Sequence, residues 1–233
     1  MVQFKRFVGV LASTFMAWGP AALGIEVTAA LSGTAGGGEI GMIEPLSIEP
    51  GAAYIEPGLA VLGSHKLTPE MEIESGLWYF SSGGAYHIKD IPTAVPGLFA
   101  EGSSRLKTTF LRIPIMFHYW FHPMFSAGLG VYFARGMGNI KGKNTLYAGG
   151  TKTTSDVNDS WDKYGLKQND YGLMLDLTHQ MPISGRYSFY ASFKYAKGLA
   201  ELAKSDNSLA AGNFFKSFKV VDMSLLLGVK AEL

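Results

Sequence analysis

Hydrophobic residues alternate with small or polar residues along two neighbouring stretches within residues 109–134. One parity of the first stretch carries apolar side chains, namely Leu111, Ile113, Ile115, Phe117, Tyr119 and Phe121. The other parity carries Arg112, Pro114, Met116, His118 and Trp120. Because successive side chains of a strand point to opposite faces, this pattern predicts a β-hairpin with one apolar wall. It turns at His122-Pro123, and each arm runs about ten residues, roughly what a tilted strand needs to cross a bilayer.

The same alternation recurs in six further segments, which predicts eight strands in all. These segments are 25–32, 53–62, 70–80, 170–180, 186–196 and 220–233. Eight is an even number and the smallest usual size of a bacterial outer-membrane barrel. The expected fold is therefore all-β, an eight-stranded antiparallel transmembrane up-and-down β-barrel.

The connections between these segments alternate in length. Those around 65–69, 121–124 and 181–185 are short, whereas 33–51, 82–108, 136–168 and 198–218 are long, polar and rich in Gly, Ser and Asn. Structureless loops of that length are unusual in a compact soluble domain but ordinary on the outer side of such a barrel. The Gly-rich stretch 32–41 lacks the spacing of a phosphate-binding loop, so it too is expected to be an extracellular loop.

The N-terminus resembles a secretory signal peptide. Lys5 and Arg6 precede an apolar run that ends in Ala22-Leu23-Gly24, which predicts cleavage after Gly24. The domain organisation is then a signal peptide over 1–24 and an outer-membrane barrel over 25–233. The expected location is the bacterial outer membrane, reached by secretion across the inner membrane.

Composition narrows the class further. Charged residues make up 17% of the chain, below the roughly 25% of ordinary soluble domains, while hydrophobic residues make up 47%. The net charge is +1, or −1 without Lys5 and Arg6, which gives no sign of a nucleic-acid surface. The chain has no cysteine, so disulfides and thiolate metal sites are excluded.

A soluble calycin-like barrel is the alternative, with its apolar face inward around an apolar ligand. Two observations favour the membrane. The polar face of the predicted strands is mostly small residues with few charges, and aromatic residues gather near the strand ends, as in interfacial girdles.

The segments GLAVLGSHKLTPEMEIESGLWYFSSGGAY, LRIPIMFHYWF and SAGLGVYFARGMG resemble the PorT-like outer-membrane β-barrel domain. That family is similar in architecture to the small OmpX and OmpA barrels, and Leu111-Arg112-Ile113-Pro114 matches its L-x-I-P strand. The resemblance extends weakly over nearly all of 25–233. It implies the barrel fold and no shared catalytic residues.

With the apolar face outward, a set of ionisable side chains points into the lumen. The set comprises Glu26, Glu56, Glu72, Glu74, Arg112, His118, Asp176, Lys194 and Lys230. Buried charges must be paired, so these residues predict a salt-bridged network that fills the barrel. Arg112 is expected beside Glu72 and Glu74, and Asp176 beside Lys194. A proton path, ion path or narrow pore is the alternative interpretation.

Enzymatic chemistry has weak support in the sequence. Lipid A-modifying barrels need a histidine with a serine and an acid, and the best candidate is His87 with Asp90 and Ser81 or Ser82. No spacing indicates a metal or another cofactor. We therefore expect a non-enzymatic structural or adhesive protein, with a porin-like channel and a lipid A-modifying enzyme as alternatives. The expected partners are outer-membrane lipids, the barrel-assembly machinery and an extracellular partner bound through the loops.

Overall fold

The computed structural model describes residues 25–42, 46–92, 99–204 and 215–233, which form nine strands. The strands are β1 (Ile25–Met42), β2 (Ser47–Lys66), β3 (Met71–Pro92), β4 (Phe99–His122), β5 (Phe125–Ala148), β6 (Thr151–Asp159), β7 (Asn169–Ser184), β8 (Tyr187–Gly198) and β9 (Phe215–Glu232). The predicted signal peptide over 1–24 lies outside the described residues.

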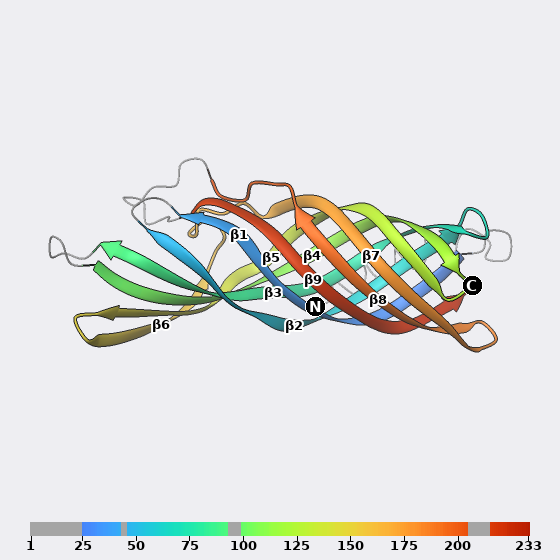
Figure 1. The fold of residues 1–233 in the computed structure, drawn as a ribbon, viewed down its shortest axis with the longest axis horizontal. Helices are drawn as coiled ribbons and strands as arrows, with labels where there is room; N and C mark the ends of the chain where they lie inside the picture. The colour runs from blue at the N-terminus through green and yellow to red at the C-terminus, as the bar shows by residue number, and fades with distance from the viewer. Residues whose placement is uncertain (1–24, 43–45, 93–98, 205–214) are drawn as a thin grey trace.

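Eight of these strands close into a ring (Figure 1). Every pairing is antiparallel, each strand bonds to the next along the chain apart from β6, and β1 closes the ring against β9. β6 lies outside the ring and pairs only with the distal part of β5. The predicted all-β, eight-stranded antiparallel barrel is therefore confirmed.

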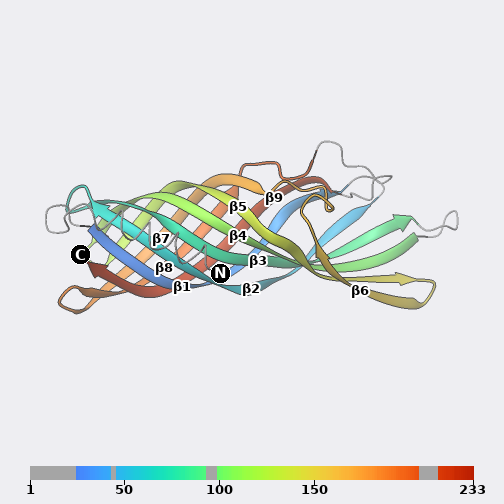
Figure 2. The same cartoon turned by 180° about the vertical axis from the view of Figure 1, so that it is seen from behind.

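The two ends of the barrel differ. At one end, here called the turn end, short connections at 67–70, 123–124 and 185–186 lie near Ile25 and Leu233, the first and last described residues. Thr68 accepts the backbone N–H of Met71 at 3.0 Å, and Gly185 has a φ of 50°, so each suits a tight turn. At the other end the strands of the β3–β4 and β5–β6 hairpins project well beyond the ring (Figure 2).

This projecting part, here called the crown, corrects the sequence prediction. It consists of 37–42 of β1, 47–56 of β2, 82–92 of β3, 99–107 of β4, 138–148 of β5 and all of β6. Apart from the end of β2, where 53–56 belong to a predicted strand, these residues were expected to be long loops, because they are rich in Gly and Ser and lack the apolar alternation of a half-buried strand. They are strands nonetheless, since cross-strand backbone bonds need no apolar side chains. The Gly-rich stretch 32–41 belongs to β1.

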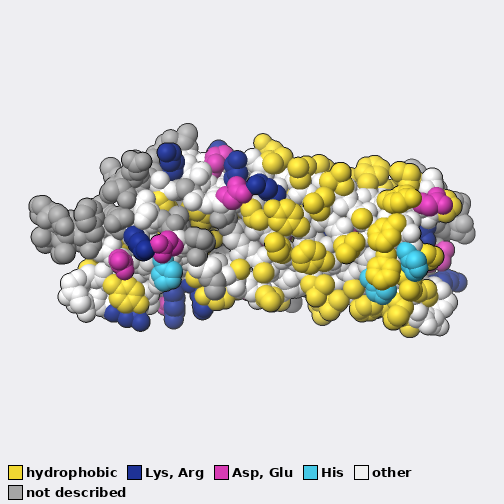
Figure 3. Space-filling model, viewed as in Figure 1, with side chains coloured by type: hydrophobic (Ala, Val, Ile, Leu, Met, Phe, Trp, Pro, Cys, Tyr) yellow, Lys and Arg dark blue, Asp and Glu magenta, His cyan; other side chains and the backbone are white. Residues whose placement is uncertain are grey.

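The outer face of the ring is an apolar belt. On β7 it runs from Tyr171 to Met181, and Leu173, Leu175 and Leu177 are each about half exposed, at 48%, 51% and 54%. At about 3.4 Å per residue and a tilt of about 40°, this stretch spans about 26 Å, the height of a transmembrane apolar band. The space-filling view shows the belt as a continuous yellow surface, with charged side chains gathered mainly beyond its edges (Figure 3).

No helix that could cross a bilayer is found in the described part of the chain.

Candidate functional site: the packed lumen and the crown

The inward-facing side chains of the ring fill its interior with polar and charged groups. Most of them are almost fully buried, whereas side chains that are buried to this degree are usually apolar. They lie in three layers, which we call the lower, middle and upper layers, counted from the turn end. Each layer is built around one basic side chain.

The lower layer is built around Lys230 of β9. Its ammonium contacts Glu72 Oε1 at 2.8 Å and also pairs with Glu26. The indole N–H of Trp120 donates to the second Glu72 oxygen at 3.1 Å. Lys66 approaches Glu26 from the rim at 3.7 Å, so each carboxylate of this layer has a cation beside it.

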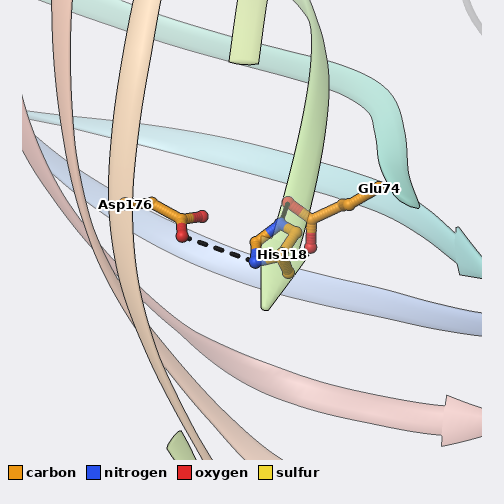
Figure 4. Close-up of side chains that lie close together, drawn as sticks. All are labelled: Glu74, His118 and Asp176. Carbon is orange, nitrogen blue, oxygen red and sulfur yellow. Dashed lines mark ion pairs between the residues drawn. The ribbon is translucent and has the colours of Figure 1, made fainter. Parts of the chain in front are cut away.

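The middle layer is built around Lys194 of β8. Its ammonium contacts Asp176 Oδ2 at 2.6 Å and Glu74 Oε1 at 3.0 Å. His118 of β4 lies between the same two carboxyl groups, with Nδ1 3.4 Å from Asp176 and Nε2 3.8 Å from Glu74 (Figure 4). Tyr190 donates its hydroxyl to Glu74 at 3.3 Å. Two carboxylates therefore face one ammonium and one imidazole, so a protonated imidazole makes the layer neutral.

The upper layer is built around Arg112 of β4. Its guanidinium binds both oxygens of Asp222 on β9, at 3.1 and 2.6 Å, in the two-pronged geometry that carboxylates favour. The same guanidinium lies 4.1 Å from the ring centre of Tyr132 and 4.5 Å from that of Phe80. Tyr132 in turn donates to Asp170 at 2.6 Å. Arg112 thus joins opposite walls of the barrel.

Aromatic side chains close the lumen above the upper layer. Trp78, Phe80, Phe110 and Trp161 form a chain of ring contacts with centroids 4.8, 5.8 and 5.5 Å apart. Trp161 belongs to the connection after β6, and it is 1% exposed because this connection folds inward over the ring. Its indole N–H donates to the carbonyl of Gly138 at 3.1 Å, and Leu166 forms a β-bridge with Ala203 beside it. We call Trp161, with the rings of Trp78, Phe80 and Phe110 below it, the Trp161 cap.

Gly136 makes room for the cap. A Cβ added at Gly136 would lie 2.3 Å from Cζ2 of Trp161, well inside van der Waals contact. Gly136→Ala is expected to lower the free energy of unfolding by about 1–3 kcal/mol through this overlap. Urea unfolding in lipid vesicles, followed by tryptophan fluorescence, measures the change. In the matched Gly37→Ala the nearest atom to the new Cβ is the Tyr86 hydroxyl at 3.7 Å, so an equal loss there would contradict the cap geometry.

The predicted lumen residues fall into two groups. The structure buries Glu26, Glu72, Glu74, Arg112, His118, Asp176, Lys194 and Lys230 within the three layers. Glu56 instead lies at the base of the crown, where it pairs with the half-exposed Lys107. Asp176 and Lys194 lie directly opposite each other on β7 and β8.

The expected position of Arg112 beside Glu72 and Glu74 is wrong. The register places Arg112 opposite Trp78, whereas Glu72 lies opposite His118 and Glu74 opposite Met116, several residues nearer the turn end. Side chains in a narrow lumen reach across it as well as along the wall. Arg112 therefore bonds to Asp222 on a strand that is not its neighbour in the sheet.

The candidate group of His87 with Ser81 or Ser82 and Asp90 is not assembled. β3 is extended, so His87 and Ser82 lie about 16 Å apart at about 3.3 Å per residue. Ser81 bonds to Thr109 at 3.0 Å, and the Ser82 carbonyl accepts from Thr108 at 3.2 Å. The side chain of Asp90 lies outside the described residues.

Glu74, His118 and Asp176 also have the atom types of a metal site, with one ligand atom of each within 4.8 Å of the others. Lys194 bonds to both of these carboxylates, so the place of the cation is already taken by its ammonium. The chemistry of this donor set does not fit a divalent ion while Lys194 is charged.

Sequence reasoning missed several residues of the lumen. Asp222 shares the inward parity of Ser224 and Leu226, and it lies within the predicted strand 220–233, so applying the alternation to that strand in full would have found it. Asp170 follows in the same way from the parity of Gly172 and Met174 on β7. No alternation marks Trp161, because it reaches the lumen from a connection and not from a strand of the ring.

The concave side of the crown carries a cleft of about 480 Å³. Its apolar lining includes Met42, Ile88, Ile91, Leu106 and Leu146, and its polar rim includes Ser104, Asn144, Asp159, Lys163 and Tyr164. Ser104 donates to Asn144 at 2.7 Å, and Lys163 pairs with Asp159 at 2.7 Å, so the rim is ordered by its own contacts. Burial raises the pKa of the Tyr164 hydroxyl, which keeps it a hydrogen-bond donor at neutral pH.

No family model and no curated protein matches the sequence. The fold is similar to the outer-membrane protein OprG of Pseudomonas aeruginosa, with a TM-score of 0.44 and 12% identity over 90% of this chain and 95% of that one. It is similar to Ail of Yersinia pestis, solved with the heparin analogue sucrose octasulfate, with a TM-score of 0.39 and 9% identity over 89% and 98% of the two chains.

A third similar structure is Neisserial surface protein A, with a TM-score of 0.40 and 10% identity over 90% of this chain and 97% of that one. Likenesses with TM-scores this low carry no argument about this chain. The resemblance to the PorT-like family stays a prediction.

Proposed function

We propose that this protein is an integral outer-membrane barrel with a sealed lumen, whose crown is a binding surface outside the cell. One observation carries the membrane assignment. The ring exposes a continuous apolar belt outward while it buries eight predicted ionisable residues inward. An exposed apolar surface of this extent is unfavourable in water, whereas a closed barrel satisfies every backbone group inside a bilayer.

The asymmetry of the two ends supports an orientation. In outer-membrane barrels the short turns lie in the periplasm and the long connections lie outside. The turn end therefore faces the periplasm, where a chain freed of its signal peptide at Gly24 would begin its first strand. The crown and its cleft then project beyond the outer leaflet.

The packing of the lumen supports a structural role for its charged residues. Each cation of the three layers contacts at least one carboxylate, and the Trp161 cap closes the ring above them. Filled lumens of this size hold the barrel in one register and leave no continuous path for hydrated ions. The porin-like alternative therefore requires the network and the cap to open.

The crown supports a binding role. Its cleft combines an apolar floor with a few polar groups, which is the usual make-up of a ligand or partner site. Its rigid strands position this cleft away from the membrane, in the place where recognition usually lies. In the cleft Ser104 is bonded to Asn144, and Lys163 is paired with Asp159. These polar groups bond to each other at the rim, and a binding protein is the function that we propose.

Conductance across a planar bilayer tests the sealed lumen. The purified full chain is expected to give no steady single-channel steps, because ions would have to pass three paired layers and the cap. Steady steps that vanish in Glu72→Gln, Glu74→Gln or Arg112→Met would contradict the sealed lumen and favour the channel. Unchanged lipid A mass in cells that express the protein is expected in parallel, since a modified mass would favour the enzyme.

A further inference from the structure

Five basic side chains follow one face of the β4–β5 pair. They are Arg105 and Lys107 on β4 and Arg135, Lys141 and Lys143 on β5, and we call them the basic strip. They lie on the outer, convex face, because the even-numbered residues Ser104, Leu106 and Asn144 line the cleft on the concave face. The strip is thus separate from the cleft.

The register places like charges directly opposite each other. Arg105 lies opposite Lys143, and Lys107 lies opposite Lys141, on two successive positions of the same face. Like charges directly opposite each other destabilise an antiparallel pair. Four cations in this arrangement repel one another unless anions lie among them.

Carboxylates compensate only part of this charge. Glu56 pairs with Lys107, and the exposed Asp156 lies 3.9 Å from Lys143. Within the described ranges, no carboxylate lies at ion-pair distance from Arg105, Arg135 or Lys141, so five cations face two anions. Arg105 is held in place by Tyr54, whose ring centre lies 3.9 Å from its guanidinium carbon.

The strip begins where the apolar belt ends. On the outer face of β4, Ile115, Ile113 and Leu111 are followed by Thr109, Lys107 and Arg105, and Arg135 lies opposite Leu111. Leu111 and Lys107 are four residues apart, so Lys107 lies about 10 Å above the belt at a tilt of about 40°. A lysine or arginine side chain at that height reaches the headgroup layer beside the hydrocarbon core.

We propose that the basic strip binds the phosphate groups of the lipids that surround the barrel in the outer leaflet. Phosphate oxygens between opposing cations relieve their repulsion, and arginine binds phosphate through two parallel hydrogen bonds. Arg135 lies at the boundary itself, and Arg105, Lys107, Lys141 and Lys143 take a second phosphate above it. The proposal rests on the membrane insertion proposed above and adds the chemical class of lipid that the barrel holds.

Native mass spectrometry of the full chain in detergent tests this with bisphosphorylated lipid A as the probe. The variant Arg105→Gln/Arg135→Gln/Lys141→Gln removes the three cations that lack a carboxylate partner. It is expected to lower the occupancy of bound lipid A at least tenfold, and lipid A stripped of its phosphates is expected to bind no better to wild type than to the variant. Lys152→Gln/Lys167→Gln/Lys216→Gln is the matched control, because it removes three exposed cations away from the strip.

Equal occupancy in wild type and the strip variant would overturn the proposal, and so would equal losses in both triple variants. Thermal unfolding in lipid-free detergent provides a second readout. There the strip variant is expected to unfold at the same temperature as wild type or at a higher one, because no phosphate is present to offset the repulsion between the strip cations of wild type. A lower unfolding temperature of the variant would contradict the proposal that these cations repel one another in the absence of phosphate. Flotation of the protein with lipid vesicles reports membrane insertion separately, so failure of the membrane assignment is distinguishable from failure of the strip.

Discussion

Lys194→Met is expected to lower the free energy of unfolding by about 3–5 kcal/mol. The lysine is buried in the middle layer, where its ammonium neutralises Glu74 and Asp176 at 3.0 and 2.6 Å. Methionine fills similar space but leaves two buried carboxyl groups with only the His118 imidazole beside them. Urea unfolding of the barrel in lipid vesicles measures the loss.

Lys197→Met provides the matched control on the same strand. Lys197 also forms a lysine–carboxylate pair, with Glu39 at 2.7 Å, but both side chains of this pair are about half exposed. The hydrogen bond from Lys197 lowers the pKa of the Glu39 carboxyl, yet water solvates both partners when the bond is lost. A comparable loss in both variants would mean that the middle layer is hydrated, against the packed lumen. Lys194→Met/Glu74→Gln/Asp176→Asn is expected to recover most of the stability.

Arg112→Met is expected to cost a similar amount, about 3–5 kcal/mol, because it leaves Asp222 buried and unpaired. The change also removes the stacking of the guanidinium on Tyr132 and Phe80. Arg112→Lys keeps the charge but loses the two-pronged bond, so it is expected to recover only part of the loss. The same urea titration measures all three proteins.

The double variant Arg112→Met/Asp222→Asn isolates the charge pair from the packing. Its free energy of unfolding is expected to exceed that of Arg112→Met alone. Together with the single variants, this value gives the interaction energy between residues 112 and 222 across the lumen. Arg186→Met, in the exposed turn between β7 and β8, is the control and is expected to change unfolding little. If removing Asp222 fails to relieve Arg112→Met, the cross-lumen ion pair is not what stabilises the upper layer.

The strands of the ring could be predicted from the sequence because each carries its own alternation of apolar and polar residues. On one strand, the odd-numbered Leu111, Ile113 and Ile115 point to one face and the even-numbered Arg112 and His118 to the other. The position of a residue in this alternation is enough to assign its face. Parity therefore placed eight of the nine predicted ionisable residues in the lumen without any structure, although Asp170 and Asp222 were missed. It also gave the Asp176–Lys194 pair, since those residues lie on strands that follow each other along the chain.

Contacts across the lumen could not be predicted, because they depend on how the barrel closes. Arg112 and Asp222 are separated by 110 residues and lie on strands that are not neighbours, so only the diameter of the lumen brings them together. The apolar residues of the crown are too few and too scattered to give the regular alternation of a half-buried strand, and its glycines and serines resemble loops in composition. Trp161 is placed by the inward fold of a connection, which leaves no periodic trace in the sequence.

The central claim is that a lipid-facing belt surrounds a packed, charged lumen, and nitroxide labelling tests it most directly. Because the chain has no cysteine, Leu175→Cys and Lys152→Cys each give one labelled position, one on the belt and one in the crown away from the basic strip. In lipid vesicles the label at 175 is expected to be accessible to oxygen and protected from a water-soluble nickel chelate, whereas the label at 152 is expected to show the reverse. Equal access of the nickel chelate to both labels would contradict the account.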